Sequence, residues 1–156
     1  MKVVVIGVGN AYRGDDRAGL AVAELLTSRL PKGVEVVECE QEPSRLLEAW
    51  QDAETVVVVD AVRSGAAPGT VHRFDASTEP VPARLFRAST HAFGVGEAIE
   101  LGRALARLPA RVLVYGIEGA EFAAGKGLSP AVAAAVSDAA DAVVADLGEE
   151  SCTNGR

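Results

Sequence analysis

The sequence predicts an α/β fold in which a mostly parallel sheet lies between two layers of helices. Short β-branched apolar runs, typical of buried strands, alternate along the chain with longer segments whose apolar residues recur at helical spacing. With 156 residues, 49% of them apolar, the chain has the size of one globular domain. Alternating strands and helices pack as a three-layer α/β/α sandwich. We expect a single domain over residues 1–148 and a disordered tail at residues 149–156.

Three strands and two helices are predicted in the first half of the chain. Residues 3–6 and 55–59 are apolar enough to be central strands, and residues 34–39 alternate loosely as a further strand. Between these strands, apolar side chains at helical spacing predict one helix that stops before Pro31 and a short one over residues 43–50.

The second half of the chain continues the alternation. A stretch rich in Ser, Gly, Ala and Pro precedes residues 70–74, so we expect this strand at an edge of the sheet. A helix over residues 95–108 and a buried strand over residues 111–117 follow. Ser129-Pro130 is a cap and first-turn pair that opens the last helix.

The turn after the first strand carries two adjacent acids. Gly7 and Gly9 allow a tight turn, and Asp15 and Asp16 then fall near the first turn of the next helix. One acidic residue at this position is usually a helix cap, favoured by the positive end of the helix dipole. Because one carboxylate suffices for capping and a second adds repulsion, the pair also indicates a site.

Other chemically capable residues fall at the same edge of the predicted sheet. Asp60 ends the third strand and His91 precedes a later helix, so both can face the crevice beyond the carboxyl ends of the strands, together with the pair Asp15-Asp16. Carboxylates with an imidazole suit a borderline divalent metal, and three protein ligands leave the site open. Each also has a structural alternative, since Asp60 can close its strand and His91 can cap its helix. His72, inside the edge strand, is predicted to be solvated.

Composition and motifs argue against several classes of function. The formal net charge of −7, with no basic run that has interleaved aromatics, argues against nucleic acid. No apolar run is long enough for a membrane span and no signal-peptide pattern is seen, so we expect a cytoplasmic protein. A dinucleotide fingerprint would need glycine where Tyr12 stands, and two acids repel a pyrophosphate, so a nucleotide-binding module is the weaker alternative.

Several short motifs follow one another along almost the whole chain. They are Gly7-Val-Gly-Asn10, Gly14-Asp-Asp-Arg-Ala-Gly19, Val59-Asp-Ala61, Pro68-Gly-Thr70, Thr90-His91 and Gly127-Leu-Ser-Pro130. In these motifs and in their order the chain resembles the hydrogenase maturation proteases, the endopeptidases that complete the large subunit of nickel-iron hydrogenases. The first motif with the later Asp and His is specific, whereas Pro-Gly and Leu-Ser-Pro alone are weak.

The resemblance implies a fold, an activity and a set of site residues. The fold is a phosphorylase/hydrolase-like twisted sheet of five strands, one of them antiparallel. The activity is removal of a short C-terminal extension from the nickel-loaded large subunit of a [NiFe] hydrogenase, by a monomer without an organic cofactor. Asp16, Asp60 and His91 occupy the metal-contacting and catalytic positions, and the metal is nickel carried by the substrate. Asp15, which is expected to point differently, is the candidate for the helix cap.

One segment departs from the family pattern. Many members carry an Asp-Gly-Gly-Thr-like segment after the second strand, linked with substrate choice, whereas this chain has Glu38-Cys-Glu-Gln-Glu-Pro43. Substrate recognition is therefore expected to differ. The alternative to an endopeptidase is a non-catalytic binding protein or chaperone that docks on the hydrogenase large subunit through the same crevice.

Overall fold

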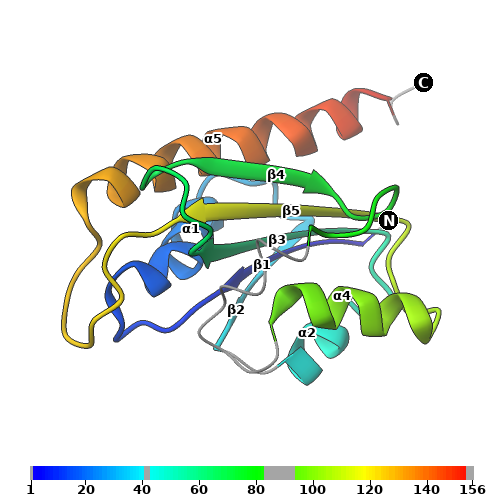
Figure 1. Ribbon diagram of the computed structural model, residues 1–156. Coiled ribbons are helices and arrows are strands. Elements are labelled where there is room, and N and C mark those ends of the chain that lie inside the picture. Colours follow the sequence, from blue (N-terminus) through cyan, green and yellow to red (C-terminus); the bar gives the residue numbers. More distant parts are fainter. Residues whose placement is uncertain (1, 41–42, 83–93, 154–156) are drawn as a thin grey trace.

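Five strands form a single sheet in the order β2-β1-β3-β5-β4 (Figure 1). The structure is a computed structural model that describes residues 2–40, 43–82 and 94–153. The pairs β1–β2, β1–β3 and β3–β5 are parallel, and β4 is antiparallel to β5 at the edge of the sheet. The predicted mostly parallel sheet with one antiparallel strand is thus confirmed. The strand bounds are β1 Val3–Val8, β2 Val34–Cys39, β3 Thr55–Val62, β4 Val71–Asp75 and β5 Arg111–Glu118.

Helices cover both faces of the sheet, which confirms the three-layer prediction. Figure 1 shows α1 (Ala18–Thr27) and α5 (Pro130–Thr153) on one face, and α2 (Pro43–Ala49) and α4 (Val95–Ala104) on the other. A single turn of 3-10 helix, η1 (Gly14–Arg17), leads into α1. None of the described helices is long and apolar enough to cross a membrane.

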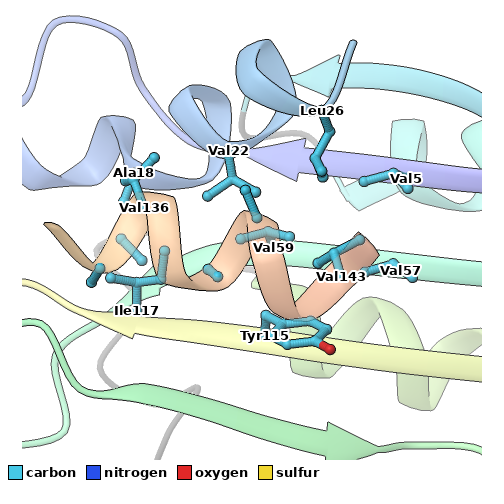
Figure 2. Close-up of a cluster of buried hydrophobic side chains, with 14 of the residues drawn as sticks. Val5, Ala18, Val22, Leu26, Val57, Val59, Tyr115, Ile117, Val136 and Val143 are labelled. Carbon is cyan, nitrogen blue, oxygen red and sulfur yellow. The ribbon is translucent and has the colours of Figure 1, made fainter. Parts of the chain in front are cut away.

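The central strand β3 separates two apolar cores. All eight of its residues are buried, as expected for a strand that is covered on both faces. Val57 and Val59 pack against α1 and α5, as Figure 2 shows, while Val56 and Val58 pack against α2 and α4. Because successive side chains of a strand point to opposite faces, Asp60 lies on the α2 and α4 face.

The order of the strands places a topological switch point between β1 and β3. From β1 the chain passes through α1 to β2 on one side, and then returns through α2 to β3 on the other side. The register pairs Gly7 with Val59, so Asp60 lies one residue beyond the last paired position of β1. Ligand sites of open α/β sheets lie at such a point, beyond the carboxyl ends of the strands.

A close approach of backbones fixes α1 at this switch point. A Cβ atom on Gly19, in the first turn of α1, would lie 2.2 Å from the carbonyl oxygen of Val8 and 2.4 Å from that of Val59. Only glycine allows the helix backbone to contact both strands in this way. The helix that follows the acids is therefore held directly against the ends of β1 and β3.

Three predicted boundaries differ from the structure. Asp60 does not end its strand, because β3 continues to Val62 by pairing with β5. The helix predicted to reach residue 108 ends at Ala104, and Leu105 beyond it is 52% exposed, so burial of an apolar face does not extend the helix further.

The last helix extends further than predicted, because α5 continues through residues 149–153, which were expected to belong to a disordered tail. Extension of an existing helix needs no new nucleation. Residues 154–156 lie outside the described residues, and the single-domain boundary at residue 148 stays a prediction.

The contact at Gly19 gives a test of the fold. We expect Gly19→Ala to lower the free energy of unfolding by roughly 3 kcal/mol, since the added methyl overlaps two strand carbonyls. Gly33→Ala is the matched control, because no atom lies within 4 Å of a Cβ placed there. Urea denaturation of both variants checks this. Equal stabilities for the two variants would contradict the tight contact.

Candidate active site

Asp16 and Asp60 are brought together at the switch point between β1 and β3. Asp16 lies in η1, which packs against β3, and Asp60 lies near the carboxyl end of β3. Each residue is only 4% exposed, although both carry carboxylates. The negative charge of Asp16 contributes to raising the pKa of Asp60, so the two carboxylates lie close enough to interact. Two of the three predicted site residues are therefore neighbours in the structure.

Protonation of Asp60 is the electrostatic consequence of this arrangement. Burial raises the pKa of Asp60, the nearby Asp16 raises it further, and a hydrogen bond from the backbone N–H of Ala61 lowers it, with a net value of about 8. That hydrogen bond joins Ala61 N to Asp60 Oδ1 at 2.8 Å. Two adjacent buried carboxylates disfavour a double negative charge. At neutral pH the pair therefore holds a proton that a cation can displace.

Asp15 does not cap a helix, contrary to the prediction. Neither η1 nor α1 has a side-chain cap, and the carboxylate of Asp15 turns instead to the connection between β5 and α5. Its Oδ2 accepts the backbone N–H groups of Ala120 (2.7 Å) and Glu121 (2.9 Å). Its two oxygens also accept the backbone N–H of Ser129 (2.7 Å) and the Ser129 hydroxyl (2.9 Å). Asp15 thus fastens this connection to the turn that carries Asp16.

These hydrogen bonds keep the fully buried Asp15 ionised. Burial raises its pKa, but the bonds from Glu121, Ser129 and Ala120 outweigh burial, so the pKa of Asp15 lies below its ordinary value of 3.8. A carboxylate that accepts several backbone N–H groups strongly favours its charged form. The adjacent acids therefore differ in function: Asp15 holds a structural charge, whereas Asp16 faces Asp60.

The glycine turn does not form a phosphate cradle. A Cβ on Gly9 would lie 2.1 Å from the carbonyl oxygen of Asp16, so the turn packs against the protein itself. The N–H groups of Gly9 and Asn10 donate to the carbonyls of Cys39 and Asp16, both at 3.2 Å. The N–H of Tyr12 donates to Asn10 Oδ1 at 2.9 Å. Because these donors are already used, the structure also disfavours the nucleotide-binding alternative.

His91, the third predicted site residue, lies outside the described residues, as does the whole of 83–93. Within the described part of the chain, no group of three or more His, Cys, Asp or Glu side chains is placed to hold a metal ion. Asp16 and Asp60 supply two carboxylates, so a metal site at this position needs further ligands. The assignment of His91 to that role stays a prediction.

A further buried carboxylate, Glu118 at the end of β5, was missed by the sequence reasoning. It is 1% exposed and accepts hydrogen bonds from the backbone N–H of Ser64 (3.0 Å), the Ser64 hydroxyl and His72 Nε2 (3.3 Å). His72 is therefore not a simple solvated strand residue, because its side chain is only 20% exposed and is held by Glu118. The apolar pattern of β5 gave no signal for this cluster.

The Glu118 cluster is not a hydrolase triad. In a Ser-His-Asp triad the imidazole lies between the hydroxyl and the carboxylate, so that it can take the proton of the hydroxyl. Here the carboxylate of Glu118 lies between Ser64 and His72. The cluster instead fastens the connection from β3 to β4 against the end of β5. The fold and the site thus define an α/β protein with a buried acid pair at the switch point of its sheet.

Comparison with known proteins agrees with this description. The family model described as hydrogenase maturation protease matches residues 20–146. A hydrogenase 2 maturation protease of Escherichia coli K12 is 30% identical over 154 residues, which cover 96% of this chain and 92% of that protein. A putative hydrogenase maturation protease of Methanocaldococcus jannaschii is 30% identical over 151 residues, which cover 93% of this chain and 96% of that protein. The chain belongs to the hydrogenase maturation protease family.

Solved structures show the same fold. The hydrogenase maturating endopeptidase HybD from Escherichia coli superposes with a TM-score of 0.84 at 28% identity, covering 96% of this chain and 94% of that chain. The [NiFe] hydrogenase maturation protease HybD from Thermococcus kodakarensis has a TM-score of 0.74 at 29% identity, covering 92% and 97%. The family model begins after Asp16, whereas these alignments cover nearly the whole chain.

Asp15 can be tested by its effect on stability. We expect Asp15→Asn to lower the free energy of unfolding by roughly 3 kcal/mol, because an amide cannot accept all of the buried N–H groups. The exposed Asp138 in α5 offers the matched control Asp138→Asn, which should change stability by less than about 0.5 kcal/mol. A loss of only about 1 kcal/mol, typical of a helix cap, would contradict the assignment.

Asp60 predicts a pH dependence of stability in the metal-free protein. Its pKa is about 8 when folded against 3.8 ordinarily, so the folded state holds a proton that the unfolded state releases. The associated stability is fully present below pH 3.8 and is lost as the pH rises to about 8. Asp60→Asn should remove this loss and be more stable than the natural protein at pH 8. Urea denaturation from pH 5 to pH 8 checks this. The control Asp138→Asn should lose stability with rising pH as the natural protein does.

Proposed function

We propose that this chain is the endopeptidase that removes a short C-terminal extension from the nickel-loaded large subunit of a [NiFe] hydrogenase. The observation that carries the proposal is the buried pair of Asp16 and Asp60 at the switch point of the sheet. Family membership supports the peptidase activity and a hydrogenase precursor as substrate. A monomer that acts in the cytoplasm, without nucleic acid or membrane, stays a prediction.

The acid pair suits inspection of a metal in the substrate. Before the substrate binds, Asp60 holds a proton that relieves the repulsion with Asp16. A divalent cation carried by the precursor replaces that proton and stabilises both carboxylates. Two oxygen ligands, with His91 as the predicted third, bind weakly without thiolates, so cysteines of the precursor would complete the coordination. A precursor that lacks nickel supplies no cation to replace that proton, so it would gain no binding energy from the two acids and would bind less tightly.

The same residues support hydrolysis of a peptide bond. A water molecule attacks the scissile carbonyl carbon, the C–N bond breaks, and the departing amine takes a proton. In this proposal the ionised Asp16 accepts a proton from the water, as a general base, and then passes that proton to the departing amine. Burial of the pair strengthens this interaction, because it excludes bulk solvent from the charged groups. Asp15 keeps Asp16 in place through the connection from β5 to α5.

A processing assay tests the activity and the inspection separately. Purified protein is incubated with nickel-loaded and with nickel-free large-subunit precursor, and loss of the extension is followed by mass spectrometry. We expect cleavage of the loaded precursor alone. If the loaded precursor binds but stays intact, the chain is a non-catalytic binding protein and not an endopeptidase. Equal cleavage of both precursors would refute nickel inspection.

Substitution of the acids tests their roles. Asp16→Asn and Asp60→Asn should each reduce processing by at least about 100-fold while the protein stays folded, because an amide can neither accept a proton from water nor supply a carboxylate to the cation. Asp138→Asn, an exposed acid in α5, is the control for the same chemical change and should process normally. A fully active Asp16→Asn would contradict the assignment. His91→Ala extends the test to the predicted third residue.

A further inference from the structure

Three basic residues on the loops around the acid pair have no acidic partner among the residues that the structure describes. Arg13 lies between β1 and η1, Arg63 between β3 and β4, and Lys126 between β5 and α5. In the described ranges, no ion pair involves any of them. Lys32 and Arg107 likewise form no ion pair with a described residue, but they precede β2 and β5 at the other end of the sheet, so the distinguishing feature of the three is that they are grouped near the acid pair. Other basic residues of the described chain, such as Arg29 and Arg73, do form ion pairs.

Backbone and ring contacts join these residues into one surface. The carbonyl oxygen of Tyr12 accepts the N–H of Gly125 at 3.0 Å, so Arg13 and Lys126 are each next in the chain to one partner of that bond. The guanidinium of Arg63 lies 4.4 Å from the ring centroid of Phe122, in the same connection as Lys126. We call Tyr12, Arg13, Arg63 and Lys126 the basic rim.

An exposed aromatic ring adds to the basic rim. Tyr12 is 76% exposed, more than the other exposed large hydrophobic residues in the described chain. Tyrosine and arginine are enriched in the centres of protein interfaces, where they supply apolar contact together with polar groups. The rim is also fixed before a partner binds, because Asp15 holds the β5 to α5 connection against the turn of Tyr12. Such preorganisation lowers the entropic cost of binding.

Charge selects the kind of partner. The opposite end of the same sheet edge is acidic, since the exposed Glu38 and Glu40 flank the last residue of β2. A negatively charged segment is therefore attracted toward β5 and repelled from β2. Screening at physiological salt limits such attraction to about 8 Å, so a short acidic segment responds to the rim and little to the net charge. A nucleic acid, with a charge every 1.7 Å or so along its axis, would feel the excess negative charge over a longer surface.

We propose that the basic rim binds an acidic segment of the hydrogenase precursor beside the bond that is cleaved. The inference rests on the proposed function and adds the chemistry by which this chain selects its substrate. The rim lies next to the turn that carries Asp16, so a segment bound there continues directly toward the acid pair. Its role is substrate binding, and the chemical step is left to Asp16 and Asp60.

The test reverses charge at the rim and, as a matched control, at the other end of the sheet. The rim variant is Arg63→Glu with Lys126→Glu, and the control is Lys32→Glu with Arg107→Glu. All four residues are exposed and form no ion pair with a described residue, and both variants change the net charge equally. We expect the rim variant to raise KM for the nickel-loaded precursor about tenfold with little change in kcat. The control should leave KM unchanged.

Salt and aromatic contact give two further readouts. At about 1 M salt, KM of the natural protein should approach that of the rim variant, because screening removes the attraction. Tyr12→Ser should raise KM at low and high salt alike, since it removes apolar contact rather than charge. Equal KM values for the rim variant and the control, in a natural protein that cleaves, would overturn the inference.

A binding measurement separates failure of this inference from failure of the proposed function. If the natural protein does not cleave, the proposed endopeptidase is wrong, and fluorescence anisotropy with labelled precursor still compares the two variants. Weaker precursor binding by the rim variant alone supports the rim in that case. A labelled single-stranded DNA of about 20 nucleotides is the competing probe. The proposal of an acidic protein partner would be wrong if the rim variant bound DNA more weakly than the control but bound the precursor equally well.

Discussion

The buried carboxylate of Asp15 is the interaction on which the functional edge of this protein depends. It accepts backbone N–H groups of Ala120, Glu121 and Ser129, and in return its own N–H donates to the carbonyl of Glu121 at 2.7 Å. A buried charge is tolerated only when its hydrogen bonds are complete, so neither partner segment can move away without leaving it unsatisfied. The turn after β1 and the connection before α5 therefore act as one rigid unit.

Two neighbouring acids take different roles because of where the turn points them. Consecutive side chains of a 3-10 turn project roughly 120° apart, so Asp15 and Asp16 cannot face the same group. The side of the turn that carries Asp15 faces the β5 to α5 connection. The side that carries Asp16 faces the buried strand β3, on which Asp60 lies. The first carboxylate is saturated with donors and stays charged, while the second shares its surroundings with a protonated acid. The structural charge of Asp15 thus lies one residue from Asp16, whose charge helps to keep the exchangeable proton on Asp60.

The two ends of the sheet edge differ in a way that suits an extended substrate. The acid pair lies between β1 and β3, with exposed acids at the end of β2 on one side and the basic rim on the other. Glu118 fastens the β3 to β4 connection, which carries Arg63, through Ser64 and His72. In the proposed complex, charge sets the direction in which the substrate segment crosses the site, and the acids at the centre carry out the chemistry. The fold places both the acid pair and the basic rim at the carboxyl ends of the strands, as expected for a site at a switch point.

The amino-acid pattern alone was enough to predict the alternation of strands and helices, the central place of β1 and β3 and the edge at which Asp16 and Asp60 lie. These follow from local periodicity and from the rule that carboxyl ends of parallel strands share one edge. The family motifs supplied the antiparallel strand, and His91 remains a prediction. Only the tertiary structure decided the partners of Asp15, which are 105 to 114 residues away, and the cluster around Glu118. Hydrogen bonds between distant segments leave no local pattern, so a buried acid that fastens a loop looks in sequence like a helix cap.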